Sequence, residues 1–301
     1  MEIIRKISKI RAKQKNCILT IGTFDGVHLG HQAIIKDVVR RARSIKEKSV
    51  VLTFHPHPLE VFDSNSHSIT TFGEKAGLIG ELGVDVLVVL RFTKKLALLS
   101  PQQFIKKVLL RLVPKEIVVG SSHTFGKNGK GNAFFLKEAG STHQFKVTVL
   151  HLRKYKGECV NSTGIRTLIR RGDMEKARAE LGQYFSIAGK IVKGSGKGEM
   201  LGFPTANLKI PSSKILPENG VYAGYAWIAG KKYKGIVNVG CCPTFKKKIR
   251  HPRVEVFIMG FKNKLYGRLL KVEFMRKIRD EKKFNSPEAL KLQIKKDILK
   301  V

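Results

Sequence analysis

The sequence predicts two domains, an open parallel α/β sheet followed by a small antiparallel β-barrel or sandwich that ends in one helix. A chain of 301 residues is longer than most single domains. Up to about residue 182, short apolar runs alternate with amphipathic segments, whereas beyond it predicted strands follow one another without intervening helices. We expect the division near residues 183–187, giving domains 1–183 and 184–301.

Five runs in the first domain consist almost entirely of apolar residues, as strands covered on both faces do. They are CILTIG, SVVLTF, DVLVVL, EIVVG and FKVTVL, at residues 17–22, 49–54, 85–90, 116–120 and 145–150. Between the first two runs, apolar residues from Ile34 to Ile45 recur at helical spacing. A later helix is predicted by Ser100 as N-cap, Pro101 at the first position and Gln103 completing a capping box.

The second domain is dominated by strand and turn signals. The segment VYAGYAWIAGKKYKGIVNVG predicts a hairpin that turns near Ala229-Gly230. RVEVFIMGFKNKLYGRLLKVEFM predicts a second hairpin that turns near Asn263-Lys264, and Ser286-Pro287 predicts the start of the final helix.

The chain is strongly basic, with 58 lysines and arginines against 23 acidic residues and a formal charge of +35. Such a charge attracts polyanions, including nucleic acid, anionic lipid and phosphorylated small molecules, without choosing among them. The basic residues form short scattered clusters, which favours a solvated surface over a dedicated nucleic-acid face. Four cysteines without CxxC spacing, and no long apolar segment, lead us to expect a cytoplasmic protein.

A first candidate site lies in TIGTFDGVHLGHQ, where a strand meets the start of a helix. Ligands bind open α/β sheets beyond the carboxyl ends of strands, and a helix N-terminus offers free N–H groups to phosphate. His28 and His31 lie in this turn, and three glycines permit close approach of the backbone: Gly22, Gly26 and Gly30. From the residues alone the histidines are phosphate ligands, a hydrogen-bonded polar pair or, with less support, part of a zinc site.

A second candidate site lies in LGFPTANLKI, residues 201–210. Alternation along a strand places the hydroxyl of Thr205 and the amide of Asn207 on one face. These are hard oxygen ligands that suit Mg²⁺ shared with ATP phosphates. Taken without other evidence, two ordinary polar residues of a strand are the better interpretation.

Motifs in both halves resemble those of one family. GTFDGVHLGHQ, TFHPHP (53–58), SSHTFGKNGKG (121–131) and VNSTGIR (160–166) are similar to the nucleotidyltransferase module of prokaryotic bifunctional riboflavin kinase/FAD synthetases. GFPTAN, GVYAG, NVGCCPTF, VEVFI, LYG and IRDEKKF follow in the order found in riboflavin kinases. The resemblance implies a Rossmann-like FMN adenylyltransferase domain followed by a β-barrel riboflavin kinase domain with a C-terminal helix.

In the first domain the resemblance implies that His28 and His31 stabilise charge on the α-phosphate of ATP while the FMN phosphate attacks it and pyrophosphate leaves. Nucleotidyl transfer needs positioning and charge neutralisation of this kind. Asp25 is expected to shape the turn, with a metal or ribose role as the lesser option. The implied ATP-binding residues are Gly22, Phe24, Gly30, Ser162, Thr163 and Arg166, and the implied flavin contacts are His57 and Phe125.

In the second domain the resemblance implies that Thr205 and Asn207 hold Mg²⁺ and ATP phosphates. Glu255 would be the base that accepts the proton of the ribityl 5′-hydroxyl as it attacks the γ-phosphate. Arg279 and Phe284 would cover the flavin. The loop KGSGKG would close over the phosphates through Gly194, Gly196 and Lys197, although a plain flexible loop is an equal interpretation.

We therefore expect an enzyme that converts riboflavin to FMN and FMN to FAD, using ATP and Mg²⁺ in both steps. An alternative retains riboflavin kinase activity alone, because Ser122 and Asn161 replace residues usual in the adenylyltransferase motifs. A remote alternative is a basic nucleic-acid-binding protein on a nucleotide-binding fold. We expect no membrane partner, and homo-oligomerisation is left open.

Overall fold

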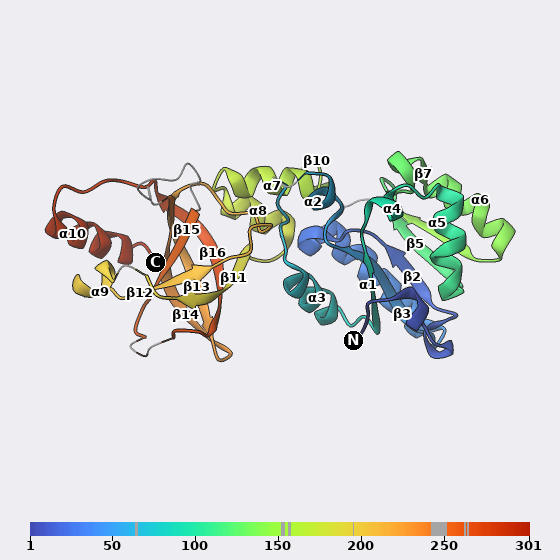
Figure 1. Cartoon of the computed structure of the whole chain (residues 1–301), viewed down its shortest axis with the longest axis horizontal. Helices are drawn as coiled ribbons and strands as arrows, with labels where there is room; N and C mark the ends of the chain where they lie inside the picture. The colour runs from blue at the N-terminus through green and yellow to red at the C-terminus, as the bar shows by residue number, and fades with distance from the viewer. Residues whose placement is uncertain are drawn as a thin grey trace. The chain divides into compact units, whose positions relative to one another are not determined.

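The computed structural model describes residues 1–63, 66–151, 154–155, 158–194, 196–241, 252–261, 263 and 265–301 (Figure 1). The chain separates into two compact units, Met1–Ser162 and Thr163–Val301. Residues 163–183 belong to the second unit in this division, and the domain boundary at residue 183 stays a prediction.

The first unit is built on a six-stranded parallel sheet in the order β1-β4-β3-β2-β5-β8. Its strands are β1 (Glu2–Ile4), β2 (Ile18–Ile21), β3 (Ser49–His55), β4 (Val86–Arg91), β5 (Glu116–Gly120) and β8 (Lys146–Leu150). Five of them are the predicted apolar runs, which confirms the parallel α/β fold. The edge strand β1 was not predicted, because three residues among alternating charges carry too short a pattern.

Helices cover both faces of this sheet. They are α1 (Leu29–Ser44), α2 (Pro58–Phe62), α3 (Phe72–Glu81), α4 (Lys94–Ala97), α5 (Pro101–Lys107) and α6 (Ala133–His143), with short 3₁₀ turns that include η3 (Asp25–Val27) and η4 (Leu109–Leu112). The predicted capping box is present at α5, where the backbone N–H of Gln103 donates to Ser100 and the backbone N–H of Ser100 donates to Gln103. The small strands β6 (Thr124–Phe125) and β7 (Gly131–Asn132) pair antiparallel, as do β9 (Lys154–Tyr155) and β10 (Glu158–Cys159).

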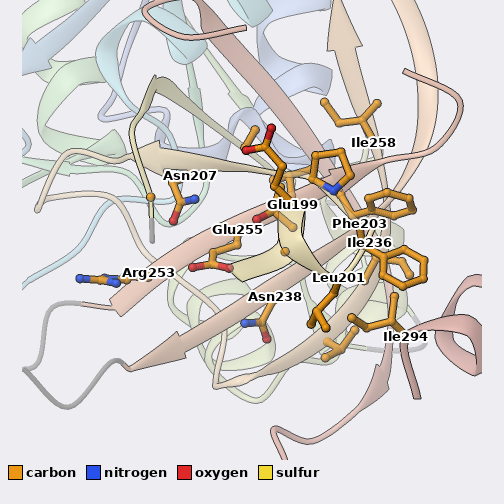
Figure 2. Close-up of a pocket in the computed structure, with 18 of the residues that line it drawn as sticks. Glu199, Leu201, Phe203, Asn207, Ile236, Asn238, Arg253, Glu255, Ile258 and Ile294 are labelled. Carbon is orange, nitrogen blue, oxygen red and sulfur yellow. The ribbon is translucent and has the colours of Figure 1, made fainter. Parts of the chain in front are cut away.

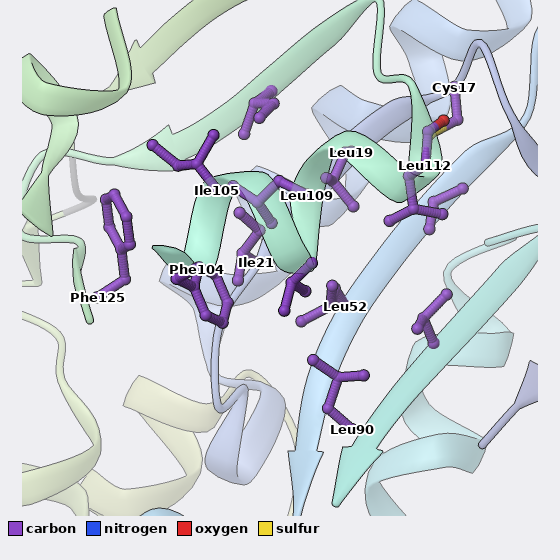
Figure 3. Close-up of a cluster of buried hydrophobic side chains, with 14 of the residues drawn as sticks. Cys17, Leu19, Ile21, Leu52, Leu90, Phe104, Ile105, Leu109, Leu112 and Phe125 are labelled. Atoms are coloured by element: carbon purple, nitrogen blue, oxygen red, sulfur yellow. The ribbon is translucent and has the colours of Figure 1, made fainter. Parts of the chain in front are cut away.

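Successive residues of each strand point to opposite faces of the sheet and so build two cores. On one face, Leu19 and Leu52 pack with Phe104, Leu109 and other residues of α5 and η4 (Figure 3). The opposite face packs against α1 and α3. Burial on both faces explains why these strands read as continuous apolar runs.

The second unit is a closed six-stranded barrel in the order β11-β12-β15-β14-β13-β16. The strands are β11 (Ser186–Val192), β12 (Thr205–Lys209), β13 (Gly220–Ile228), β14 (Lys231–Cys241), β15 (Pro252–Ile258) and β16 (Leu269–Arg279), all antiparallel to their neighbours. Four helices accompany it: α7 (Ser162–Arg170), α8 (Met174–Leu181), α9 (Lys197–Met200) and α10 (Pro287–Ile298). The predicted final helix is confirmed, with Ser286 as its N-cap.

Only the first of the two predicted hairpins exists. Strands β13 and β14 pair directly and turn at Ala229-Gly230, both of which have positive φ angles. The second hairpin is wrong, because β15 pairs with β12 and β14 whereas β16 pairs with β11 and β13. Closing the barrel gives each strand two partners, and sequence adjacency did not reveal which strands those are.

Candidate active sites

The turn after β2 lies where the strand order of the sheet reverses, because β2 separates β3 from β5. Such switch points leave a crevice at the carboxyl ends of the strands. Phe24 and Val27 adopt positive φ angles of 48° and 42°, which bulky residues rarely do. Strained backbone of this kind persists only where the surroundings fix it.

Asp25 fixes the turn from within. Its buried carboxylate accepts hydrogen bonds from the backbone N–H groups of Ile69 and Thr70, each at 3.0 Å, and from the Thr70 hydroxyl at 3.2 Å. The Ser162 hydroxyl donates to the backbone carbonyl of Asp25 at 3.1 Å. Asp25 therefore shapes the turn as expected, and Ser162 is brought against it from 137 residues along the chain.

The two histidines begin α1 side by side. His28 is the N-cap, and its Nδ1 accepts a long hydrogen bond of 3.4 Å from the backbone N–H of His31. Their rings stack with centroids 3.6 Å apart. Burial lowers the pKa of His28 to about 4 against a smaller opposing effect of Asp25. Burial also lowers the pKa of His31 well below its usual range, and the charges of His28 and Lys75 act in the same direction.

Both histidines are therefore neutral at pH 7. Because Nδ1 of His28 accepts a hydrogen bond, its single proton lies on Nε2, which makes Nε2 a donor. Nδ1 of His31 is buried and has no hydrogen-bond partner among the described residues. The pair thus has polar atoms left over for a ligand.

For the remaining residues predicted for this site, the structure shows some contacts within the protein but does not test their contacts to ligands. Gly22 lies against the Phe24 ring, where an added Cβ would come within 3.1 Å of Phe24 Cζ. Phe24 and Phe125 are buried in the cores. Phe24 lies edge-on to His31 and so packs directly against the site, whereas Phe125 packs beside Phe104. Contacts to the ligands stay predictions for Gly22, Phe24, Gly30, His57, Phe125, Ser162, Thr163 and Arg166.

The second unit contains a cavity of about 740 Å³. Figure 2 shows Asn207, Glu255 and Asn238 on one side of it, and Phe203, Ile236 and Ile294 on the other. A cavity with one polar side and one apolar side can take a ligand that carries both phosphates and a large ring.

The polar side is a row across three strands. Asn207 of β12 lies directly opposite Glu255 of β15, and Glu255 lies directly opposite Asn238 of β14. Opposed side chains on neighbouring antiparallel strands lie about 5 Å apart at Cβ. Burial raises the pKa of the Glu255 carboxyl, although Arg253 partly offsets this effect. A carboxylate with a raised pKa is a better proton acceptor.

Gly194 of the glycine-rich segment lies against Asn207, at one end of this row. A Cβ added to Gly194 would be 2.1 Å from Nδ2 of Asn207, so only glycine lets the loop come this close. Gly196 begins α9 in the left-handed region with φ 75°. Ser195 and the side chain of Lys197 lie outside the described residues, so the predicted phosphate role of this loop is not tested.

Arg279 and Phe284 line the cavity, and Arg279 also holds α10. Its guanidinium donates to the buried carboxylate of Asp297 at 2.8–3.1 Å and lies 5.7 Å from the centroid of the Phe284 ring. Gln293 donates to the same carboxylate at 2.8 Å. The ion pair fixes α10, whose Leu290 and Ile294 form part of the apolar wall.

Three residues near these sites were missed by sequence reasoning. Asn238 and Arg253 line the second cavity, and Lys75 is buried beside the turn that carries the histidines. Asn238 belongs to the motif NVGCCPTF, but the sequence assigned it no role. The motif lies outside the described residues from position 242 onward. A lysine within an amphipathic helix gives no signal that it is buried.

The first unit has a parallel sheet with a turn suited to phosphate at its switch point, and the second has a barrel with a half-polar cavity. These features define the class of two-domain proteins that bind nucleotides. Residues 10–164 match the family model described as FAD synthetase, and residues 181–301 match the model described as riboflavin kinase. The chain belongs to the bifunctional riboflavin kinase/FMN adenylyltransferase family.

Relatives match along nearly the whole chain. The bifunctional riboflavin kinase/FMN adenylyltransferase of Bacillus subtilis (strain 168) is 37% identical over 297 residues, covering 96% of this chain and 92% of the relative. The protein of that name from Escherichia coli (strain K12) is 35% identical over 304 residues, covering 99% and 96%.

A similar solved structure is named a macrolide-efflux protein, from Streptococcus pneumoniae. It has a TM-score of 0.88 and 29% identity and covers 98% of this chain and 96% of its own. In the part of this chain that the structure describes, helices long and apolar enough to cross a membrane are absent.

Proposed function

We propose that this chain phosphorylates riboflavin to FMN in its second unit and adenylylates FMN to FAD in its first, with ATP as the donor in both reactions. The observation that carries the proposal is the pair of sites just described, each within the matching family region. The first has two neutral histidines at a helix N-terminus, and the second has a half-buried carboxylate in a half-polar cavity.

In the adenylyl step, the FMN phosphate attacks the α-phosphate of ATP and pyrophosphate leaves. Nε2–H of His28 donates to the α-phosphate oxygens, on which negative charge develops, and His31 assists from the same helix turn. The helix N-terminus of α1, with its positive dipole end, adds to this stabilisation. Ser162, Thr163 and Arg166 bind the ATP phosphates, while His57 and Phe125 contact the flavin.

In the kinase step, the riboflavin 5′-hydroxyl attacks the γ-phosphate and ADP leaves. Glu255 accepts the hydroxyl proton, and its partial burial raises its pKa and so its basicity for this task. The apolar wall containing Phe203, Ile236 and Ile294 holds the flavin ring. Gly194, Gly196 and Lys197 close over the phosphates, and Arg279 and Phe284 cover the flavin.

The residues of the second site fit a magnesium ion that is held mainly by nucleotide phosphates. Thr205 and Asn207 offer neutral oxygen atoms on the cavity wall, and the described residues contain no cluster of three or more His, Cys, Asp or Glu able to hold a metal by themselves. Mg²⁺ prefers such shared sites and keeps several of its waters. When bound, it would neutralise charge on the transferred phosphoryl group.

One assay tests the proposal. The full chain is incubated with riboflavin, ATP and Mg²⁺, and the flavins are separated by chromatography. We expect FMN to appear first and FAD to follow. FMN without FAD supports the kinase-only alternative that Ser122 and Asn161 suggested, and absence of both products contradicts the proposal. Omission of Mg²⁺ should abolish both steps.

A further inference from the structure

Lys75 is a buried lysine beside the turn that carries His28 and His31. It belongs to α3, and its side chain is only 5% exposed. No ion pair joins its ammonium group to a carboxylate of the residues that the structure describes. A charge buried without an oppositely charged partner is costly, so a buried lysine here requires a specific reason.

The ammonium group links two strand ends. It donates to the backbone carbonyl of Thr23 at 2.9 Å, to the hydroxyl of Thr53 at 3.1 Å and to the backbone carbonyl of Phe54 at 3.2 Å. Thr23 lies in the turn after β2, and Thr53 and Phe54 lie near the end of β3. The Thr53 hydroxyl in turn donates to the Thr23 carbonyl at 3.1 Å, so the three acceptors form one network around the lysine.

The segment that contains Lys75 therefore holds the strained turn at two points. Ile69 and Thr70 bind the carboxylate of Asp25, and Lys75 binds the carbonyl of Thr23. Between these points lies Phe24, with its positive φ angle, and directly after them come His28 and His31. Such a turn keeps its conformation only if its surroundings determine it.

We propose that Lys75 is a positioning residue of the adenylyltransferase site, which holds the turn that carries His28 and His31 against the end of β3. The proposal rests on the proposed function of this site. Its charge also affects the neighbouring histidines, because it lowers the pKa of His31 and of His55. Burial is the larger cause of both shifts, and the Lys75 charge acts in the same direction. A neutral ring can donate to phosphate from one nitrogen while the other accepts.

The test compares Lys75→Met with the matched control Lys115→Met in the full chain. Lys115 belongs to the same unit but forms an ion pair with Glu47 at 2.6 Å, away from the turn. We expect Lys75→Met to lower kcat for FAD formation from supplied FMN by about 10- to 100-fold, the loss typical of misplaced catalytic groups. Riboflavin phosphorylation by the same molecules should be unchanged, and Lys115→Met should leave both rates unchanged.

A pH profile separates this role from simple packing. Burial lowers the pKa of Lys75 to about 8, against smaller opposing effects of Asp25 and Glu60; the other titratable groups affected by its charge are His31 and His55. The Lys75 ammonium group is charged below that pH, so the wild-type kcat for FAD formation should fall as the pH rises through about 8. This alkaline limb should be absent in Lys75→Met.

Each outcome decides one question. If the wild-type chain makes FMN but no FAD, the proposed adenylyltransferase function fails. If it makes FAD and Lys75→Met keeps more than half of wild-type kcat, or keeps the alkaline limb, the positioning role is wrong. If Lys75→Met does not unfold cooperatively, Thr53→Val replaces it, because this variant removes one acceptor and leaves the charge. A fall in kcat for FAD formation of about 3- to 10-fold is then expected, as for a smaller displacement of the same groups. An unchanged kcat overturns the proposal.

Discussion

The two candidate sites fix their reactive groups by different means. In the first unit, His28 and His31 lie three residues apart on one turn, and that turn is held by its own Asp25 carboxylate and by the side chains of Thr70 and Lys75. In the second unit, the row of Asn207, Glu255 and Asn238 comes from three separate strands and is fixed by backbone register. Side-chain hydrogen bonds therefore fix the reactive groups of the first site, and backbone pairing between strands fixes those of the second.

The sharpest test of this difference is Glu255→Gln, which keeps the shape of the row and removes the base. We expect riboflavin phosphorylation to fall by about 10²- to 10⁴-fold, the usual contribution of general base catalysis. FAD formation from supplied FMN should be unchanged, because the first unit has its own site. Chromatography of the flavin products measures both rates. Equal loss of both products would contradict independent sites.

The next largest effect should follow Asp297→Ala, which leaves the Arg279 guanidinium without its buried partner. Breaking one side of a buried ion pair costs about 3–5 kcal/mol, so the barrel should unfold at a lower temperature and lose affinity for riboflavin as α10 detaches. Thermal unfolding and the KM for riboflavin measure the two effects. Asp280→Asn is the control, since Asp280 is exposed and pairs with Lys277 at the surface; it should behave like wild type.

Replacing the first histidine tests the other site. His28→Gln should lower the rate of FAD formation by about 10²- to 10³-fold, as loss of one donor to a developing charge does, and should leave FMN formation intact. The rates are measured with FMN and with riboflavin as separate substrates. A variant that still makes FAD at close to the wild-type rate would show that His28 only caps α1.

The smallest expected effect is a dependence of the first unit's stability on pH between about 6.5 and 4, which arises from its histidines. The pKa of His28 and of His123 is lowered by burial to about 4, so these rings stay neutral in the folded state while the unfolded chain takes up protons below about pH 6.5. Stability is therefore complete above pH 6.5 and is lost as the pH falls toward 4. Each ring can account for roughly 3 kcal/mol of that loss.

Urea unfolding between pH 7.5 and 4.5 measures this loss. His28→Gln should flatten the decline, whereas His143→Gln, which alters an exposed histidine at the end of α6, should keep the wild-type slope. An unchanged slope in His28→Gln would mean that His28 takes up its proton in the folded protein as readily as in the unfolded chain.

Most of the fold followed from local patterns. Five apolar runs became the parallel strands, the capping box at Ser100 opened α5, and Ser286-Pro287 opened α10. Hydrophobic spacing and capping are local properties, so sequence alone reveals them. The predicted pairing of β15 with β16 failed because strand pairing in a closed barrel depends on segments distant in sequence.

For the sites, the sequence by itself determined the chemistry that a single motif contains: the two histidines of one turn, the hydroxyl and amide of one strand, and a resemblance spanning both halves. Only the tertiary structure decided which distant groups join them. It placed Asn238 opposite Glu255 by register, tied Arg279 to Asp297, and buried Lys75 against Thr23. A lysine in a helix and an asparagine in a strand look the same in sequence whether they face water or a ligand, because burial is a property of the packed chain.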